Sequence, residues 1–214
     1  MQIISVNCAR AEALGDGKPT LTGINKLPQA GAVQATPEGL VDDAICNRKH
    51  HGGPDQAVYC FSQTDYDWWS ELLKQALVPG TFGENLTVSG PDSGTVCVGD
   101  RFCAGVVELE VTSPRIPCNT LNRRMQNPRF GQAFREAARP GWYCRVIKPG
   151  PLAAGLEWQH VPFAGDRVSM AQMMVDYYNP RVTVATAERY LRIPVHHKTK
   201  TKMRTLLEKG LEKG

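Results

Sequence analysis

One segment of the chain combines a cysteine with a nearby cation and two residues that stiffen the backbone. It reads Ser113-Pro114-Arg115-Ile116-Pro117-Cys118 and follows residues 106–112, whose alternation of apolar and charged side chains predicts a half-buried strand. Each proline fixes its own φ and restricts the residue before it. A nearby guanidinium favours the thiolate, the form of cysteine that attacks electrophiles and binds metals. The alternative is a buried structural thiol, a common environment for free cysteine.

A second segment groups cations and imidazoles immediately before two glycines. It reads Arg48-Lys49-His50-His51-Gly52-Gly53-Pro54-Asp55. Glycines allow positive φ and close backbone approach, so successive N–H groups can form a nest for an anion. Neighbouring side chains of an extended segment point apart, which argues against a metal site made of His50 and His51 alone. The alternative is a polar loop with a Gly-Gly turn.

A third segment, Thr81-Phe82-Gly83-Glu84-Asn85-Leu86, predicts a tight turn that enters a strand. Asn85 would hydrogen-bond either its own loop or a polar ligand. Asn122 lies in the polar and basic stretch that follows Cys118, and we include it among the candidate binding residues.

Short strands separated by Gly- and Pro-rich turns must position these three segments. The patterns predict strands at 1–6, 56–61, 95–98, 101–103, 142–147 and 156–161. They also predict helices at 62–77, capped by Ser62 or Thr64, and at 130–138. We expect 95–98 and 101–103 to form a hairpin around Gly99-Asp100. Because strands and helices do not alternate regularly, we predict a mainly β, α+β fold: a mixed or antiparallel barrel with peripheral helices.

The pattern changes to helices after Pro162. A capping box, Ser169 to Gln172, opens one helix, Thr183 caps a second, and a lysine-rich third covers 198–213. We therefore predict two domains, a strand domain at 1–163 and a three-helix domain at 164–214.

The composition of the chain argues against some classes of partner and metal site. The chain of 214 residues has a net charge of +4, which is too weak to argue for a nucleic-acid partner. The seven cysteines include no Cys-x-x-Cys pair, which argues against structural zinc and favours a reducing compartment. No run predicts a secretion signal or a membrane span, so we expect a cytoplasmic protein without membrane partners. The oligomeric state is left open.

The ordered set of motifs resembles the MOSC family, named for the C-terminal domain of molybdenum cofactor sulfurase, and most of all its YiiM-type 6-hydroxylaminopurine reductases. The resemblance rests on these segments in this order: Lys49-His50-His51-Gly52-Gly53-Pro54-Asp55, Gly83-Glu84-Asn85-Leu86, Val98-Gly99-Asp100, Pro114-Arg115-Ile116-Pro117-Cys118 and Gly141-Trp142-Tyr143-Cys144-Arg145-Val146. It spans nearly the whole chain and implies a MOSC β-barrel followed by three helices.

The resemblance also implies roles for individual residues. Cys118 would be the thiolate ligand of molybdenum in the molybdopterin cofactor, and a soft thiolate suits such a centre. Lys49 and His51 would be catalytic, with His51 as proton donor. The implied cofactor-binding residues are Gly52, Gly53, Gly83, Glu84, Asn85, Arg115 and Asn122. His50 stands where an apolar residue is expected, and it is either a second proton donor or an exposed neighbour.

The implied reaction is the reduction of N-hydroxylated bases, R–NHOH to R–NH2 and water. Since the sequence has no flavin or nicotinamide motif, electrons would come from a separate reductase partner. One alternative is a carrier that holds cofactor or a persulfide on Cys118 without turnover. Another is a nucleic-acid-binding barrel with a basic helical tail, for which steeply salt-dependent binding would be the sign.

Overall fold

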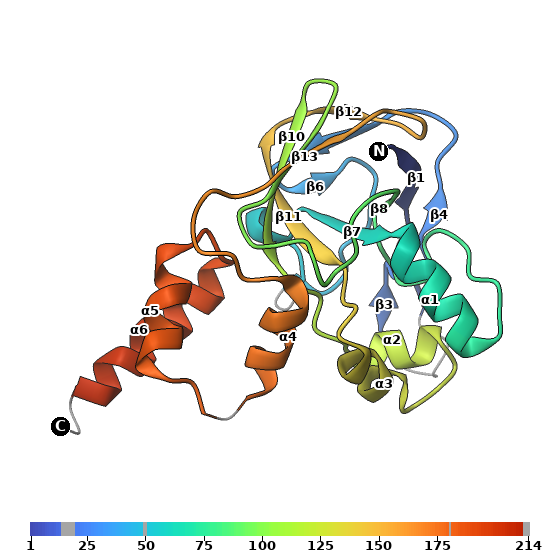
Figure 1. The fold of residues 1–214 in the computed structure, drawn as a ribbon. Coiled ribbons are helices and arrows are strands. Elements are labelled where there is room, and N and C mark those ends of the chain that lie inside the picture. The colour runs from blue at the N-terminus through green and yellow to red at the C-terminus, as the bar shows by residue number, and fades with distance from the viewer. Residues whose placement is uncertain (14–19, 49–50, 180, 212–214) are drawn as a thin grey trace.

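The computed structural model describes residues 1–13, 20–48, 51–179 and 181–211, and Figure 1 shows a group of strands flanked by helices. The strands are β1 (Ile3–Cys8), β2 (Glu12–Ala13), β3 (Leu21–Thr22), β4 (Leu27–Pro28), β5 (Val33–Thr36), β6 (Gly39–Leu40), β7 (Val58–Ser62), β8 (Leu86–Val88), β9 (Arg101–Ala104), β10 (Val107–Ser113), β11 (Trp142–Lys148), β12 (Gly150–Leu152) and β13 (Gln159–Val161). The helices are α1 (Gln63–Leu73), α2 (Asn119–Arg124), α3 (Phe130–Ala137), α4 (Met170–Tyr178), α5 (Val184–Arg192) and α6 (His197–Leu211), with a short 3-10 helix η1 (Pro54–Gln56).

The main sheet has eight strands in the order β13-β9-β10-β11-β7-β8-β1-β4. Only its β7–β8 pair is parallel, and the other neighbours are antiparallel. The prediction of a mixed or antiparallel sheet in an α+β fold is therefore confirmed. Among the described residues the sheet has two edge strands, β13 and β4, so closure into a barrel is not shown. Smaller sheets contain β12-β5-β6 and β2-β3.

The strand that leads to Cys118 is buried on both faces, although its alternating sequence predicted one exposed face. Glu108 and Glu110 lie on the charged face and are each 8% exposed. Arg101 on β9 and Lys148 on β11 pair with Glu108 at 2.6 and 2.9 Å, while Arg145 pairs with Glu110 at 3.1 Å. Cations on both neighbouring strands thus cover the carboxylates.

The caps predicted at Ser169 and Thr183 are confirmed, and of the two candidates at the first helix the cap is Ser62. A hydroxyl at each start accepts the backbone N–H three residues on: Ser62 from Asp65 at 3.0 Å, Ser169 from Gln172 at 3.1 Å, and Thr183 from Thr186 at 3.1 Å. Each bond satisfies one of the N–H groups that a helix start leaves without a partner. In the part of the chain that the model describes, no helix combines the length and apolarity needed to cross a membrane.

Two apolar clusters hold these elements together. An aromatic cluster packs α1 and α3 around Phe61, Trp69 and Phe82. The larger cluster joins the sheet to the C-terminal helices, because Met170 and Tyr190 pack with the residues of β10 and β11. The helices after Pro162 thus share a core with the strands, and their division into a separate domain at residue 164 stays a prediction.

The predicted hairpin around Gly99-Asp100 is wrong. Thr95 and Val98 lie in turns and Cys97 forms an isolated bridge with Ser169, while β9 pairs with β10 instead. The reason is the buried carboxylate of Asp100, which accepts the backbone N–H of Cys97 at 2.9 Å and that of Phe163 at 2.8 Å. It also pairs with Arg167 at 2.9 Å, so it ties the turn to the segment that leads into α4.

Replacing Asp100 with asparagine should destabilise the fold. Burial raises the pKa of Asp100, but hydrogen bonds from His160, Phe163, Cys97 and Arg167 outweigh it and lower that pKa below its ordinary value. Asp100→Asn leaves buried donors without a charged acceptor, so the free energy of unfolding at pH 7 should fall by about 2–4 kcal/mol. Urea denaturation measures this. Since the pKa is depressed, the carboxylate's contribution is present above its unfolded pKa and is lost as pH falls through the folded one.

The matched control is Asp166→Asn. Asp166 pairs with Arg192 at 3.0 Å, but the two side chains are 42% and 62% exposed. An exposed pair of this kind contributes about 0–1 kcal/mol. Equal destabilisation by the two substitutions would contradict the role assigned to Asp100.

Candidate active site

Cys118 lies where the loop after β10 meets the start of α2, and it is partly exposed. Two cavities meet at its side chain, a larger one of about 600 Å³ and a smaller one of about 150 Å³. Residues that line both are Asn47, His51, Gln56, Cys118, Thr120 and Tyr143. Cys118 therefore lies in the wall that the two cavities share.

The two cavities have different walls. Residues 20–26 and 43–47 contribute to the smaller cavity, together with Gly52, Gly83, Asn85 and Arg115. The larger cavity lies between the loop that carries Cys118 and the C-terminal helices, from which Met173, Tyr190 and other side chains line it. Segments that are far apart in sequence thus form one continuous site around Cys118.

Its surroundings stabilise Cys118 as a thiolate. Burial raises the pKa of the thiol, but a hydrogen bond from His51, the charge of Arg115 and the backbone N–H of Leu121 outweigh it and lower the pKa to about 6. At pH 7 the thiolate is therefore the main form. The expectation that Arg115 assists deprotonation agrees with this result, and His51 adds the hydrogen bond.

Arg115 itself is held rigidly inside the protein. It is 6% exposed, its Nη1 donates to the carbonyl oxygen of Phe82 at 2.8 Å, and its guanidinium lies 5.1 Å from the centre of the Tyr59 ring. The ring face attracts the cation. Its Nε has no hydrogen-bond partner among the described residues.

The Gly-Glu-Asn segment mainly shapes the wall of the smaller cavity. Gly83 has a φ of +73°, and a Cβ there would come within 2.9 Å of a side-chain carbon of Ile24. Glu84 is buried and accepts bonds from Tyr66 and Thr87, both at 2.7 Å, and it does not line either cavity. Its carboxylate fixes the turn from inside.

Asn85 lines the smaller cavity while its side chain joins three elements. Its Oδ1 accepts the backbone N–H of Tyr59 at 3.1 Å, and its Nδ2 donates to Asp43 at 2.8 Å and to the carbonyl of Asn7 at 3.3 Å. The sequence left two roles for Asn85, a hydrogen bond within the protein or one to a polar ligand. The structure shows hydrogen bonds within the protein. Its remaining capacity toward a ligand is one acceptor lone pair.

The basic Gly-Gly segment is described from His51 onward. Gly52 and Gly53 have φ values of +78° and +82°, which other residues rarely adopt, and Gly52 lines the smaller cavity. The predictions for Lys49 and His50 lie outside the described residues. Asn122 donates to the carbonyl of Pro128 at 3.0 Å and accepts the N–H of Gly131 at 2.6 Å, and it lines neither cavity.

The sequence assigned no individual role to some residues of the site. Gln56, Tyr143 and Ser113 line the larger cavity, and Gln56 Oε1 and Ser113 Oγ lack hydrogen-bond partners within the described chain. Ser113 and Tyr143 stand inside the motifs quoted above and Gln56 directly follows one, so position in the sequence could have pointed to them. His196 also lines this cavity, and no pattern around it predicted a role.

The depressed pKa of Cys118 predicts selective alkylation. In cofactor-free protein, the rate of reaction with iodoacetamide should rise with pH and reach half its maximum near pH 6. His51→Leu removes the hydrogen bond that stabilises the thiolate and should move this midpoint to higher pH. Peptide mapping by mass spectrometry at a series of pH values measures both.

Cys46 is the internal control, because it is exposed and partial desolvation raises its pKa above the ordinary value of a thiol. At pH 6.5 Cys118 should therefore react first. A midpoint for Cys118 at or above that of Cys46 would contradict the environment described here.

Comparison with known proteins places the chain among relatives of the same fold. The crystal structure of YiiM from Geobacillus stearothermophilus superposes with a TM-score of 0.79 at 25% identity, covering 95% of this chain and 97% of that one. Escherichia coli YiiM superposes with a TM-score of 0.75 at 23% identity, which supports the fold alone.

Sequence comparison extends this likeness. Escherichia coli YiiM is 30% identical over 180 residues, or 83% of this chain and 80% of YiiM. A Gibberella moniliformis protein named as a reductase is 31% identical over 157 residues, which are 28% of its length. The model of the MOSC domain matches residues 47–159, which include His51, Arg115 and Cys118. The resemblance inferred from the ordered motifs is confirmed, and the chain belongs to the MOSC domain family.

Proposed function

We propose that this protein binds the molybdenum cofactor and reduces N-hydroxylated bases or related N-oxygenated compounds. The observation that carries the proposal is a thiolate, Cys118, placed where two cavities meet. A soft thiolate is the protein ligand that suits a soft metal centre. Membership of the MOSC domain family and the likeness to YiiM and to a named reductase support the same role.

The residues around Cys118 fit such a cofactor. Arg115 Nε, Gln56 Oε1 and Ser113 Oγ are buried polar atoms without partners among the described residues, and all three residues line one of the cavities. Unpaired buried polar atoms are rare in folded proteins and call for a partner. A polar cofactor can supply hydrogen bonds to all three.

The proposed reaction adds two electrons and two protons: R–NHOH + 2 e⁻ + 2 H⁺ gives R–NH2 and H2O. When bound, molybdenum would supply the two electrons, and a separate reductase would restore them. Cys118 would hold the metal. His51 lines both cavities, so its imidazole would donate a proton to the leaving oxygen of a substrate in the larger one. The expected electrostatic role of Lys49 remains a prediction.

The larger cavity favours an enzyme over a carrier. A volume of about 600 Å³ lies within the range of small-molecule binding sites. Its wall combines apolar groups such as Met173 with polar ones such as Ser113 and Gln56. A carrier needs the thiolate alone, whereas a cavity of this size beside it can hold a substrate.

Loss of Cys118 should remove both metal and activity. The protein is produced in a molybdate-supplied host that makes the cofactor, and metal content is measured together with reduction of 6-hydroxylaminopurine by a competent electron donor. Cys118→Ala should contain no molybdenum above background and should reduce no substrate, because the metal loses its protein ligand. A Cys118→Ala variant that keeps both would refute the proposal.

Cys103→Ser is the matched control. Cys103 is partly exposed on β9 and lines neither cavity, so this variant should keep the molybdenum and activity of the wild type. Wild-type protein that is loaded with molybdenum but reduces none of a panel of N-hydroxylated bases and amidoximes would instead support the carrier.

A further inference from the structure

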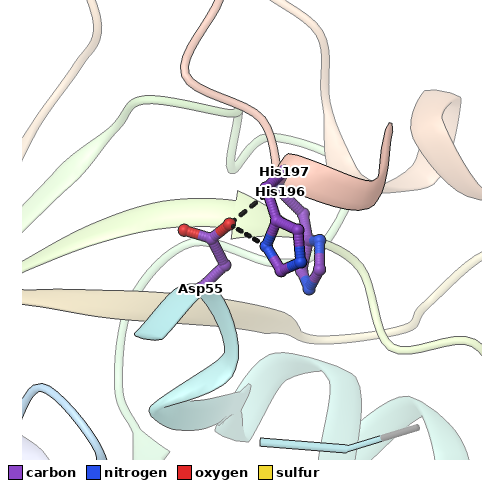
Figure 2. Close-up of side chains that lie close together, drawn as sticks. All are labelled: Asp55, His196 and His197. Carbon is purple, nitrogen blue, oxygen red and sulfur yellow. Dashed lines mark hydrogen bonds and ion pairs between the residues drawn. The ribbon is translucent and has the colours of Figure 1, made fainter. Parts of the chain in front are cut away.

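Two histidines and a carboxylate, His196, His197 and Asp55, lie close together (Figure 2). Of these, His196 lines the larger cavity. Asp55 follows the Gly-Gly segment, whereas His196 and His197 come from the start of α6. One carboxylate oxygen of Asp55 accepts the backbone N–H of His197 at 2.7 Å and its Nδ1–H at 2.8 Å. The other oxygen pairs with Arg145 at 2.8 Å.

The partners of this cluster argue against a metal ion. Potential ligand atoms of the three residues lie within 4.8 Å of one another, as in many metal sites. However, Asp55 already pairs with the cation of Arg145, and the Nδ1 of His196 accepts the backbone N–H of Lys198 at 3.0 Å. A metal on Nε2 of a neutral imidazole would need the proton on Nδ1, which would oppose that N–H.

The same contacts fix the position and the tautomer of His196. Its backbone N–H donates to Thr112 of β10 at 3.2 Å, and it directly precedes α6, where its ring nitrogen caps the helix. Because Nδ1 is an acceptor, the neutral ring carries its proton on Nε2. Burial, reinforced by the positive charges of His197, Lys198 and Arg145 against the opposing charge of Asp55, lowers the pKa of His196 to about 4, so the ring is neutral at pH 7.

The Nε2–H of His196 is a donor without a partner. No described residue hydrogen-bonds to this nitrogen, and the atom is open to solvent although the residue as a whole is only 5% exposed. The side chain lines the larger cavity, which Cys118 and His51 also line. The donor is therefore available to an occupant of the cavity, whose acceptor atom would replace water as its partner.

We propose that His196 binds the substrate in the larger cavity by donating its Nε2–H to an acceptor atom of the base, such as a ring nitrogen. This inference rests on the proposed function for the class of ligand. The cavity wall suits a flat heteroaromatic ring, because Met173, Met203 and Tyr190 line it beside His196. The C-terminal helices would thus select the substrate, while Cys118 and His51 serve the chemistry.

Two substitutions separate the donor from the fold. His196→Asn keeps an acceptor for the N–H of Lys198 and is a favourable residue before a helix, but it removes the Nε2 donor. His196→Gln places an amide N–H near the position of Nε2. Calorimetry with the full-length protein as purified gives the Kd for adenine, the product expected from 6-hydroxylaminopurine, and steady-state kinetics give KM for 6-hydroxylaminopurine.

His196→Asn should weaken adenine binding and raise KM about tenfold, with an unchanged midpoint of thermal unfolding and unchanged molybdenum content. His196→Gln should restore both constants to within about threefold of the wild type. The matched control is His197→Asn, whose amide can replace the Nδ1–H bond to Asp55 and whose side chain does not line the cavity. It should bind adenine like the wild type.

The outcomes test the role of His196 and the proposed reductase function separately. Adenine affinity that is the same in His196→Asn and the wild type, or equally weakened in His197→Asn, would overturn the role of His196. Wild-type protein that fails to bind adenine at millimolar concentration would overturn it as well, whereas molybdenum loading and turnover of another N-hydroxylated compound would leave the proposed function standing. Adenine binding that depends on His196 in a protein without reductase activity would support this inference and refute the proposed function.

Discussion

The site depends on keeping a cation inside the protein next to Cys118. A buried guanidinium is costly unless its charge and its N–H groups have partners. Arg115 has the carbonyl of Phe82, the face of Tyr59 and the thiolate itself. This arrangement explains why Gly83 follows Phe82: the chain must turn sharply there, close to Ile24, so that the carbonyl meets the guanidinium. The position of the Arg115 guanidinium and the conformation of the turn at Gly83 therefore depend on each other.

The sequence predicts well those features that depend on neighbours along the chain. Caps such as Ser62 and Ser169 bond to a residue three positions on, and the two prolines around Arg115 restrict their own segment. Because these effects are local, the sequence predicts them. Asp100 was misread because its partners, His160 and Phe163, lie about sixty positions away. Gly99-Asp100 suits a hairpin turn locally, but in the structure the carboxylate of Asp100 is a buried hydrogen-bond acceptor.

The candidate site shows the same division. Cys118, Arg115 and His51 were identified from local residue types and an ordered resemblance, and the structure brings all three together. Their motifs say little about the larger cavity, however, because His196 is placed there by its own bond to Thr112 and by the bonds of the next residue, His197, to Asp55. Such contacts join residues that are more than eighty positions apart, and no periodicity or spacing records them.

The meeting of two cavities at one thiolate has a chemical consequence. A group held by Cys118 can be anchored in the smaller cavity, whose wall of Gly83, Asn85 and Arg115 is built from turns within the strand region. In the proposed function, substrate would enter the larger cavity and meet the same thiolate from the side of the C-terminal helices. Residues on α4 to α6 would then affect which compound is accepted, whereas Arg115, whose charge favours the thiolate, lines the smaller cavity. Under this proposal the helices select the substrate from one side of the site, and Arg115 keeps Cys118 ionised from the other.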